Sequence, residues 1–193
     1  MAQKYPAPKP EDATWFDHHQ LNFWIWACLR DANAYLEASQ ASEDASNRVF
    51  SCDVEAMQSA REQSDLLKSQ QDLCAYHFVL TTSNLLRLLT RAIHLFPSIK
   101  PAYDKANHFR NEARDLRNMV EHSHGKDGYL VGQGEKQDEY VREDSPQEGI
   151  AADATSLIVN DEGHWLGGRL CVEKIVSEVS ELQKAAQFLP TPQ

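Results

Sequence analysis

The sequence has few cysteines, no long apolar run and no glycine-rich loop of the kind that cradles phosphates. Its four cysteines are scattered and form no Cys-x-x-Cys pair. Isolated thiols within apolar helical patterns behave as small hydrophobic side chains, so we expect reduced cysteines and a cytoplasmic protein. The longest apolar run, Phe23 to Leu29, is too short to cross a bilayer. We therefore expect neither a membrane span nor a disulfide framework.

The net charge of −10 excludes a protein that coats nucleic acid without specificity. The charge is uneven, however, because seven cations and three anions lie between Asn84 and Arg117. This segment therefore carries +4 and the rest of the chain −14. A locally basic segment on an acidic body permits a small nucleic-acid site.

Length and composition predict one domain. The chain has 193 residues, of which 41% are apolar and 25% charged, as is ordinary for a globular protein with a genuine core. We expect residues 14–188 to form a single helical domain. The proline-containing residues 1–13 lack the apolar stretch of a secretory signal and are expected to be a flexible leader, and residues 189–193 a tail.

The first helix is expected to begin at Thr14, with Asp17 three residues later completing a capping box. Its expected core face consists of Phe16, Phe23, Trp24, Trp26, Leu29 and Leu36. The tryptophans and phenylalanines give more aromatic surface than one stripe can bury, so part of it is available for a subunit contact. Residues 40–65 are polar and are expected to form a loop, followed by a weakly amphipathic start of the second helix.

Three further helices follow from apolar residues at steps of three and four. They are expected over Leu66–Phe96, over about Ala102–Ser123 after Pro97 and Pro101, and over about Leu170–Phe188. The expected core stripe of the second is Leu66, Leu73, Tyr76, Leu80, Leu85, Leu88, Leu89, Ala92 and Leu95. That of the third is Tyr103, Ala106, Phe109, Ala113, Leu116 and Val120, and that of the last is Val172, Ile175, Val176, Val179, Leu182 and Ala186.

The segment before the last helix differs in composition. Residues 126–153 are rich in glycine and charged residues and are expected to be a mobile acidic loop, which would become a lid if it ordered over a cleft. Residues 155–168 carry two short apolar runs around Asn160–Gly163 and predict a β-hairpin. The expected fold is all-α: an antiparallel four-helix bundle with a small β-hairpin inserted before the last helix.

Chemically active side chains gather at the end of the third expected helix. Arg117, Asn118 and His122 occupy its last turns, just before Gly125, a residue type that often closes helices. Arginine grips phosphate with a planar fork of donors, and a histidine that titrates near neutrality serves as general acid or base. Further candidates for phosphate binding are Arg110, Arg114 and His124. The alternative for the arginine is an ion pair between Arg117 and Glu121, one turn later, which contributes little energy.

Arg117-Asn-Met-Val-Glu-His122 resembles the R-[polar]-x-x-x-H signature of the HEPN superfamily, whose members are small helical bundles. The specific match covers these six residues, and the order of elements is similar over roughly 14–188. Many HEPN proteins are metal-independent ribonucleases of toxin or defence type. They typically form homodimers, and many pair with a nucleotidyltransferase-like partner. The resemblance thus implies RNA or a nucleotide as ligand, no metal and no cofactor.

The resemblance also implies roles for individual residues. Arg117 would stabilise the charged phosphate in the transition state, and His122 would assist transfer of the 2′-OH proton or protonate the leaving oxygen. Asn118 would orient one of these groups, and the product would be a 2′,3′-cyclic phosphate. Other members of the superfamily bind nucleotides or partners without cleaving RNA, so the fold alone does not give the chemistry.

Two other functions compete with the nuclease. The first is a metal-binding bundle, in which His18 and His19 meet His122 and His124 across the helices. Adjacent histidines point about 100° apart, which disfavours coordination by both members of a pair. The second is a non-catalytic dimeric module, antitoxin-like or otherwise devoted to protein interaction. The tryptophan-rich first helix and the acidic remainder of the chain support it.

Overall fold

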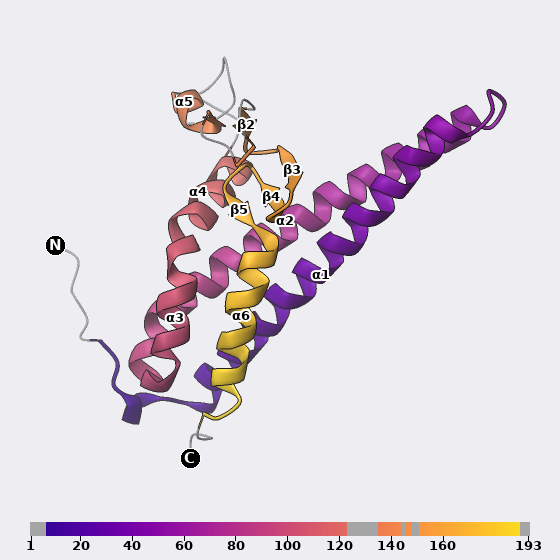
Figure 1. Ribbon diagram of the computed structural model, residues 1–193. Coiled ribbons are helices and arrows are strands. Elements are labelled where there is room, and N and C mark those ends of the chain that lie inside the picture. The colour runs from indigo at the N-terminus through magenta and orange to yellow at the C-terminus, as the bar shows by residue number, and fades with distance from the viewer. Residues whose placement is uncertain (1–6, 123–134, 144–145, 148–150, 190–193) are drawn as a thin grey trace.

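The computed structural model describes residues 7–122, 135–143, 146–147 and 151–189. These residues form long packed helices and a small three-stranded antiparallel sheet that precedes the last helix (Figure 1). The expectation of a mostly helical chain with a small antiparallel β element before the last helix is confirmed. The expected leader contains a short 3-10 helix at Pro10–Asp12, which contacts α2. Within the described ranges no helix is long and apolar enough to cross a membrane.

Helix α1 (Trp15–Ser51) begins where the sequence predicts. The Thr14 hydroxyl accepts the Asp17 backbone N–H at 3.2 Å, and the Asp17 carboxylate accepts the Thr14 N–H at 3.1 Å. This reciprocal cap satisfies two of the backbone donors that a helix start leaves unpaired. The predicted start of the first helix is therefore confirmed.

The sequence predicts that residues 40–65 hold a loop and then the start of the second helix, but the loop is much shorter than expected. Helix α1 continues to Ser51, and α2 (Met57–Leu95) begins after a connection of residues 52–56. Together the two helices form a long hairpin whose connected end projects beyond the other helices as an arm (Figure 1). Small side chains hold the arm together: Ser42 and Ala45 are buried, and the hydroxyls of Ser46 and Ser64 lie 3.2 Å apart. Two helices can approach closely along small residues, so the arm needs no stripe of large apolar side chains.

The expected core face of the first helix is also largely wrong. Phe16, Phe23 and Trp26 are exposed. Trp24, Leu29 and Leu36 are half-buried and pack against the core. The fully buried face of α1 consists instead of Leu21, Ile25, Cys28, Ala32 and Tyr35.

Helix α2 buries its second half. Leu85, Leu89, Ala92 and Leu95 are buried as expected, whereas Leu66 and Leu73 are exposed. The exposed pair belongs to the first half of α2, which pairs with the end of α1, so the predicted stripe is correct only where α2 meets the other helices.

The third predicted helix is divided in two. Helix α3 (Lys100–Ala106), which has Pro101 in its first turn, is joined by a 3-10 turn (Asn107–Phe109) to α4 (Arg110–Glu121). The core stripe predicted for this third helix is confirmed, except that Val120 is half-buried and Met119 is buried beside it. The helix ends at Glu121, two residues earlier than expected, and His122 is its C-cap. The expected stop at Gly125 lies outside the described residues.

The described parts of the expected 126–153 loop contain regular structure. Helix α5 (Gln137–Tyr140) leads into β1 (Val141–Arg142), which pairs antiparallel with β2 (Ala152–Asp153). The side chains of Tyr140 and Ala152 are buried. For these residues the prediction of a loop without structure is wrong.

The predicted hairpin is confirmed and gains a third strand. Strand β3 (Leu157–Asn160) pairs with β4 (Gly163–Leu166), with Asn160 opposite Gly163, and β4 also pairs with β5 (Leu170–Cys171). Helix α6 (Val172–Ala186) follows at once, and its expected stripe is buried apart from the half-buried Val176. Helix α6 packs on α1 and α3, while α4 packs on α2. The core therefore lies among α1, α2, the α3–α4 segment and α6.

Candidate functional site

The predicted site at the end of α4 is built around an ion pair. Arg117 Nε lies 3.3 Å from Glu121 Oε2, without hydrogen-bond geometry, and both side chains are partly buried. A terminal nitrogen of the same guanidinium donates to Asn118 Oδ1 at 2.7 Å. The alternative reading of the arginine, a pair with Glu121 one turn later, is thus confirmed as a contact. A catalytic role for Arg117 stays a prediction.

The remaining residues of the predicted site are less closely gathered. His122 is exposed, and its backbone N–H donates to the Asn118 carbonyl at 2.8 Å, which closes the helix. Arg114 pairs with Asp115 at 2.9 Å, and Arg110 is exposed at the start of α4. His124 lies outside the described residues. The structure therefore brings together Arg117 and Asn118, with Glu121 as a third member.

The four-histidine metal site is not supported by the placement of its members. His18 and His19 lie at the start of α1, at the opposite end of the packed helices from the end of α4 (Figure 1). His19 stacks on Trp15 with ring centroids 5.0 Å apart, and the His18 ring meets Phe96 edge-on. Among the residues with a described position, no group of three or more metal-ligating side chains is found.

A cleft of about 820 Å³ opens where the arm leaves the packed helices. Its apolar walls come from α2, from the sheet and from Leu116 and Val120 of α4. Ser42, Lys68 and Asp72 add polar groups from the arm. None of the three predicted catalytic residues lines this cleft, so the motif and the cleft do not form one site.

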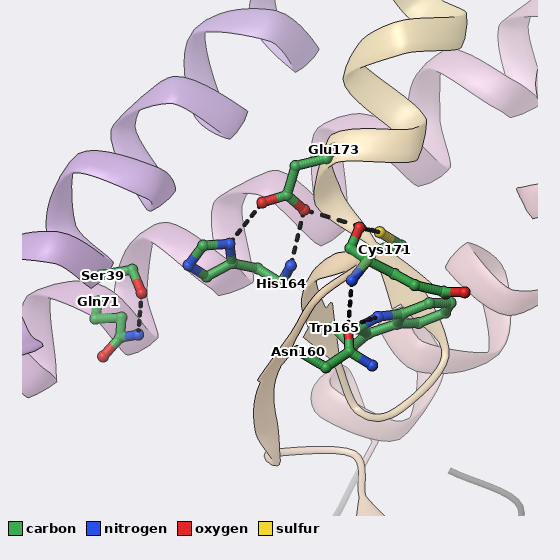
Figure 2. A network of polar contacts seen from close by, with 8 residues as sticks. Ser39, Gln71, Asn160, His164, Trp165, Cys171 and Glu173 are labelled. Carbon is green, nitrogen blue, oxygen red and sulfur yellow. Dashed lines mark hydrogen bonds and ion pairs between the residues drawn. The ribbon is translucent and has the colours of Figure 1, made fainter. Parts of the chain in front are cut away.

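A second polar cluster, which is not among the predicted sites, links β4 to the start of α6. Glu173 Oε1 lies 2.6 Å from His164 Nδ1, and Glu173 Oε2 accepts the His164 backbone N–H at 2.8 Å. Figure 2 shows this carboxylate between His164 and the thiol of Cys171. Burial alone would raise the pKa of Glu173, but the hydrogen bonds from His164 outweigh it and hold that pKa below its ordinary value. The cluster fastens the hairpin to α6.

Tyr35 of α1 packs against this cluster. Its ring meets the His164 ring edge-on, with centroids 5.8 Å apart, and the side chain is fully buried. Burial raises the pKa of Tyr35 to about 12, partly offset by the nearby side chains of Gln71 and Ser39. Those two bond each other at 3.0 Å, whereas the Tyr35 hydroxyl makes no hydrogen bond of good geometry with any described residue. The buried phenol of Tyr35 and the partly buried imidazole of His164, held by the Glu173 carboxylate, therefore form a structural joint.

The outer face of α1 carries a strip of exposed aromatic and cationic side chains, which we call the aromatic strip: Trp15, His19, Phe23, Trp26 and Arg30. At about 100° per residue, these five side chains fall within an arc of about 80° on the helix. Their neighbour Phe16 is also exposed, and the guanidinium carbon of Arg30 lies 5.1 Å from the Trp26 ring centroid. The strip is the surplus aromatic surface that the sequence indicates, on the face opposite to the core.

Comparison with known proteins gives no further assignment: no protein-family model, curated protein or solved structure matches this chain. Membership of the HEPN superfamily therefore stays a prediction, based on the six residues from Arg117 to His122 and on the helical fold.

Proposed function

We propose that this protein is a cytoplasmic helical module that acts by binding protein through the aromatic strip of α1. In this proposal α1, α2, the α3–α4 segment and α6 are the four helices of an antiparallel bundle, and the strip is its docking face. The observation that carries the proposal is the exposure of large aromatic side chains: 63% for Trp15, 44% for Phe23 and 53% for Trp26.

Scattered exposed apolar residues are ordinary, but a contiguous group on one helix face is not. Tryptophan and arginine are also the side chains that most often dominate binding energy at protein interfaces. The strip holds two tryptophans and one arginine within 16 residues of a single helix, which gives a docking face about 22 Å long. The strip lies on a regular, well-capped helix, so its side chains are held in position before binding.

A photo-crosslinking amino acid at position 23 tests this function. We expect irradiation of cells that produce the protein to give discrete covalent protein adducts, because residue 23 lies in the middle of the strip. The matched control is the same amino acid in place of Phe188, which is 86% exposed but lies just beyond α6. The proposal fails if position 23 gives no more adduct than position 188.

A metal-independent ribonuclease of the HEPN type is the second candidate. It is favoured by the bond that orients the Asn118 amide on Arg117 and by the exposure of His122 at the helix end. Its weakness is the Glu121 carboxylate, which partly neutralises the arginine that would hold a phosphate. In this proposal RNA binds at the end of α4, and a nucleotidyltransferase-like protein is the natural partner to mask it.

Cleavage of mixed RNA in the presence of EDTA tests this candidate. If it is correct, Arg117→Ala and His122→Ala each lower the cleavage rate about 10²- to 10⁴-fold while the fold is kept, and the products end in 2′,3′-cyclic phosphate. His94→Ala is the matched control, because His94 is also an exposed histidine in the last turn of a helix. Cleavage that persists in both site variants would assign the activity to a contaminant and remove this candidate.

A further inference from the structure

The aromatic strip is nearly palindromic in the order of its side chains. Trp15 and Arg30 are equally far from a point between residues 22 and 23, and so are His19 and Trp26. At each of these two distances from the central point, an aromatic side chain on one side therefore corresponds to a cationic or imidazole side chain on the other. Phe23 lies next to the central point. This order is what a surface needs if it is to pair with itself about a two-fold axis.

The monomer already groups these side chains in two pairs. At one end the Trp15 and His19 rings are stacked, 5.0 Å apart and only 8° from parallel. At the other end Arg30 lies over the Trp26 ring. All four side chains are exposed, Trp15 by 63% and Trp26 by 53%. An antiparallel second copy of α1 would bring the Trp15–His19 pair of one chain against the Trp26–Arg30 pair of the other.

We propose that the partner of the aromatic strip is a second copy of this chain, bound as an antiparallel α1–α1 dimer with its two-fold axis next to Phe23. This inference rests on the proposed function and names its partner. Arg30 of each copy, whose guanidinium also bonds the carboxylate of Asp31, then faces Trp15 of the other copy, and the ring quadrupole attracts the guanidinium. The two Phe23 rings pack beside the axis, where an isologous interface is most completely buried.

Because the two α1 helices are antiparallel, this dimer differs from one in which the two Arg117 groups would form a composite nuclease site. The end of α4 lies toward the arm from the strip (Figure 1). Antiparallel packing of α1 points the two arms in opposite directions, so the two α4 ends lie on opposite sides of the axis. Each Arg117 group then lies apart from that of the other copy, and the dimer serves association.

Sedimentation equilibrium of the purified protein over a concentration series tests the proposal. We expect the wild type to reach twice the chain mass of 21.9 kDa and Phe23→Asp to weaken self-association at least about 100-fold, because a carboxylate would be buried beside its copy. Phe188→Asp, which changes an exposed phenylalanine outside the strip, should dimerise as the wild type does. Circular dichroism checks that the helices are retained; Phe23 is exposed, so they should be.

Cysteine cross-linking tests the orientation. In a background with Cys52→Ser and Cys74→Ser, an introduced Phe23→Cys should form a disulfide-linked dimer under mild oxidation, because the two copies of position 23 meet beside the axis. Trp26→Cys should not, since it faces position 19 of the other copy. A parallel dimer would cross-link at both positions, and that result would overturn the proposal.

The outcomes also separate this inference from the proposed function. A wild type that stays monomeric, or a dimer indifferent to Phe23→Asp, overturns the α1–α1 pairing. If position 23 nevertheless forms photo-adducts with a different protein, the strip is a docking face whose partner is not a second copy. If it forms no adducts either, both the inference and the proposed function fail.

Discussion

Replacing Gly163 by alanine is expected to lower the free energy of unfolding by about 3–5 kcal/mol. Gly163 has a φ of +128°, which side-chain-bearing residues rarely adopt, and an added Cβ would come within 2.5 Å of the Glu173 carboxyl carbon. The variant would thus strain the hairpin and displace the carboxylate that accepts two bonds from His164. Urea unfolding followed by circular dichroism measures the loss.

A double-mutant cycle with Glu173→Ala provides the control. Removing the Glu173 side chain also removes the clash, so in that background Gly163→Ala should cost only the backbone strain of about 1–3 kcal/mol. Equal costs in the two backgrounds would mean that the carboxylate does not occupy the space beside Gly163. The cycle therefore tests the joint between hairpin and α6 directly.

Tyr35→Ala should have a similarly large effect, a loss of about 3–5 kcal/mol, because it empties one of the largest fully buried positions in the core. Tyr35→Phe should cost less than about 1 kcal/mol, since the hydroxyl that it removes makes no hydrogen bond with the described residues. Thermal and urea unfolding of both variants give the comparison. A cost above about 2 kcal/mol for Tyr35→Phe would show that the hydroxyl has a partner, such as a buried water.

Helix α1 shows why the sequence predicts a helix more readily than its buried face. Two stripes run along its first half, one with Phe23 and Trp26 and the other with Leu21, Ile25 and Cys28, and both repeat with helical spacing. Hydrophobicity favours the aromatic stripe, but the core selects the smaller side chains, since α2 and α6 pack closely against them. The choice depends on packing between elements distant in sequence, which a local pattern does not contain.

The sequence does not predict the arm, for a related reason. Its contact surface is built from serine, alanine and glutamine, as in the bond from Gln71 to Ser39, so it has no large apolar stripe. In contrast, local signals gave correct predictions: the Thr14–Asp17 cap, the turn between Asn160 and Gly163, and the apolar stripe of α6. Each of these depends on residues close together in the chain.

The candidate sites also differ in whether their residues lie close together in the chain. The contact between Arg117 and Glu121 is one helical turn long and could be predicted from spacing. The contact between His164 and Glu173 joins a strand to a helix nine residues later, and no periodicity or motif in the sequence pairs the two residues. A signal was present, however, because an acidic residue in the first turn of a predicted helix, directly after a hairpin, is placed to meet that hairpin.

The length of α1 has a consequence for the shape of the dimer. Its 37 residues extend over about 55 Å, and most of that length lies on the arm side of Phe23. Antiparallel pairing would therefore produce a rod with an arm at each end and about 85 Å between the two tips. Phe50 and Val54, both more than 80% exposed, would be presented at each tip. Such a molecule would be a spacer, able to hold two bound partners at a fixed separation.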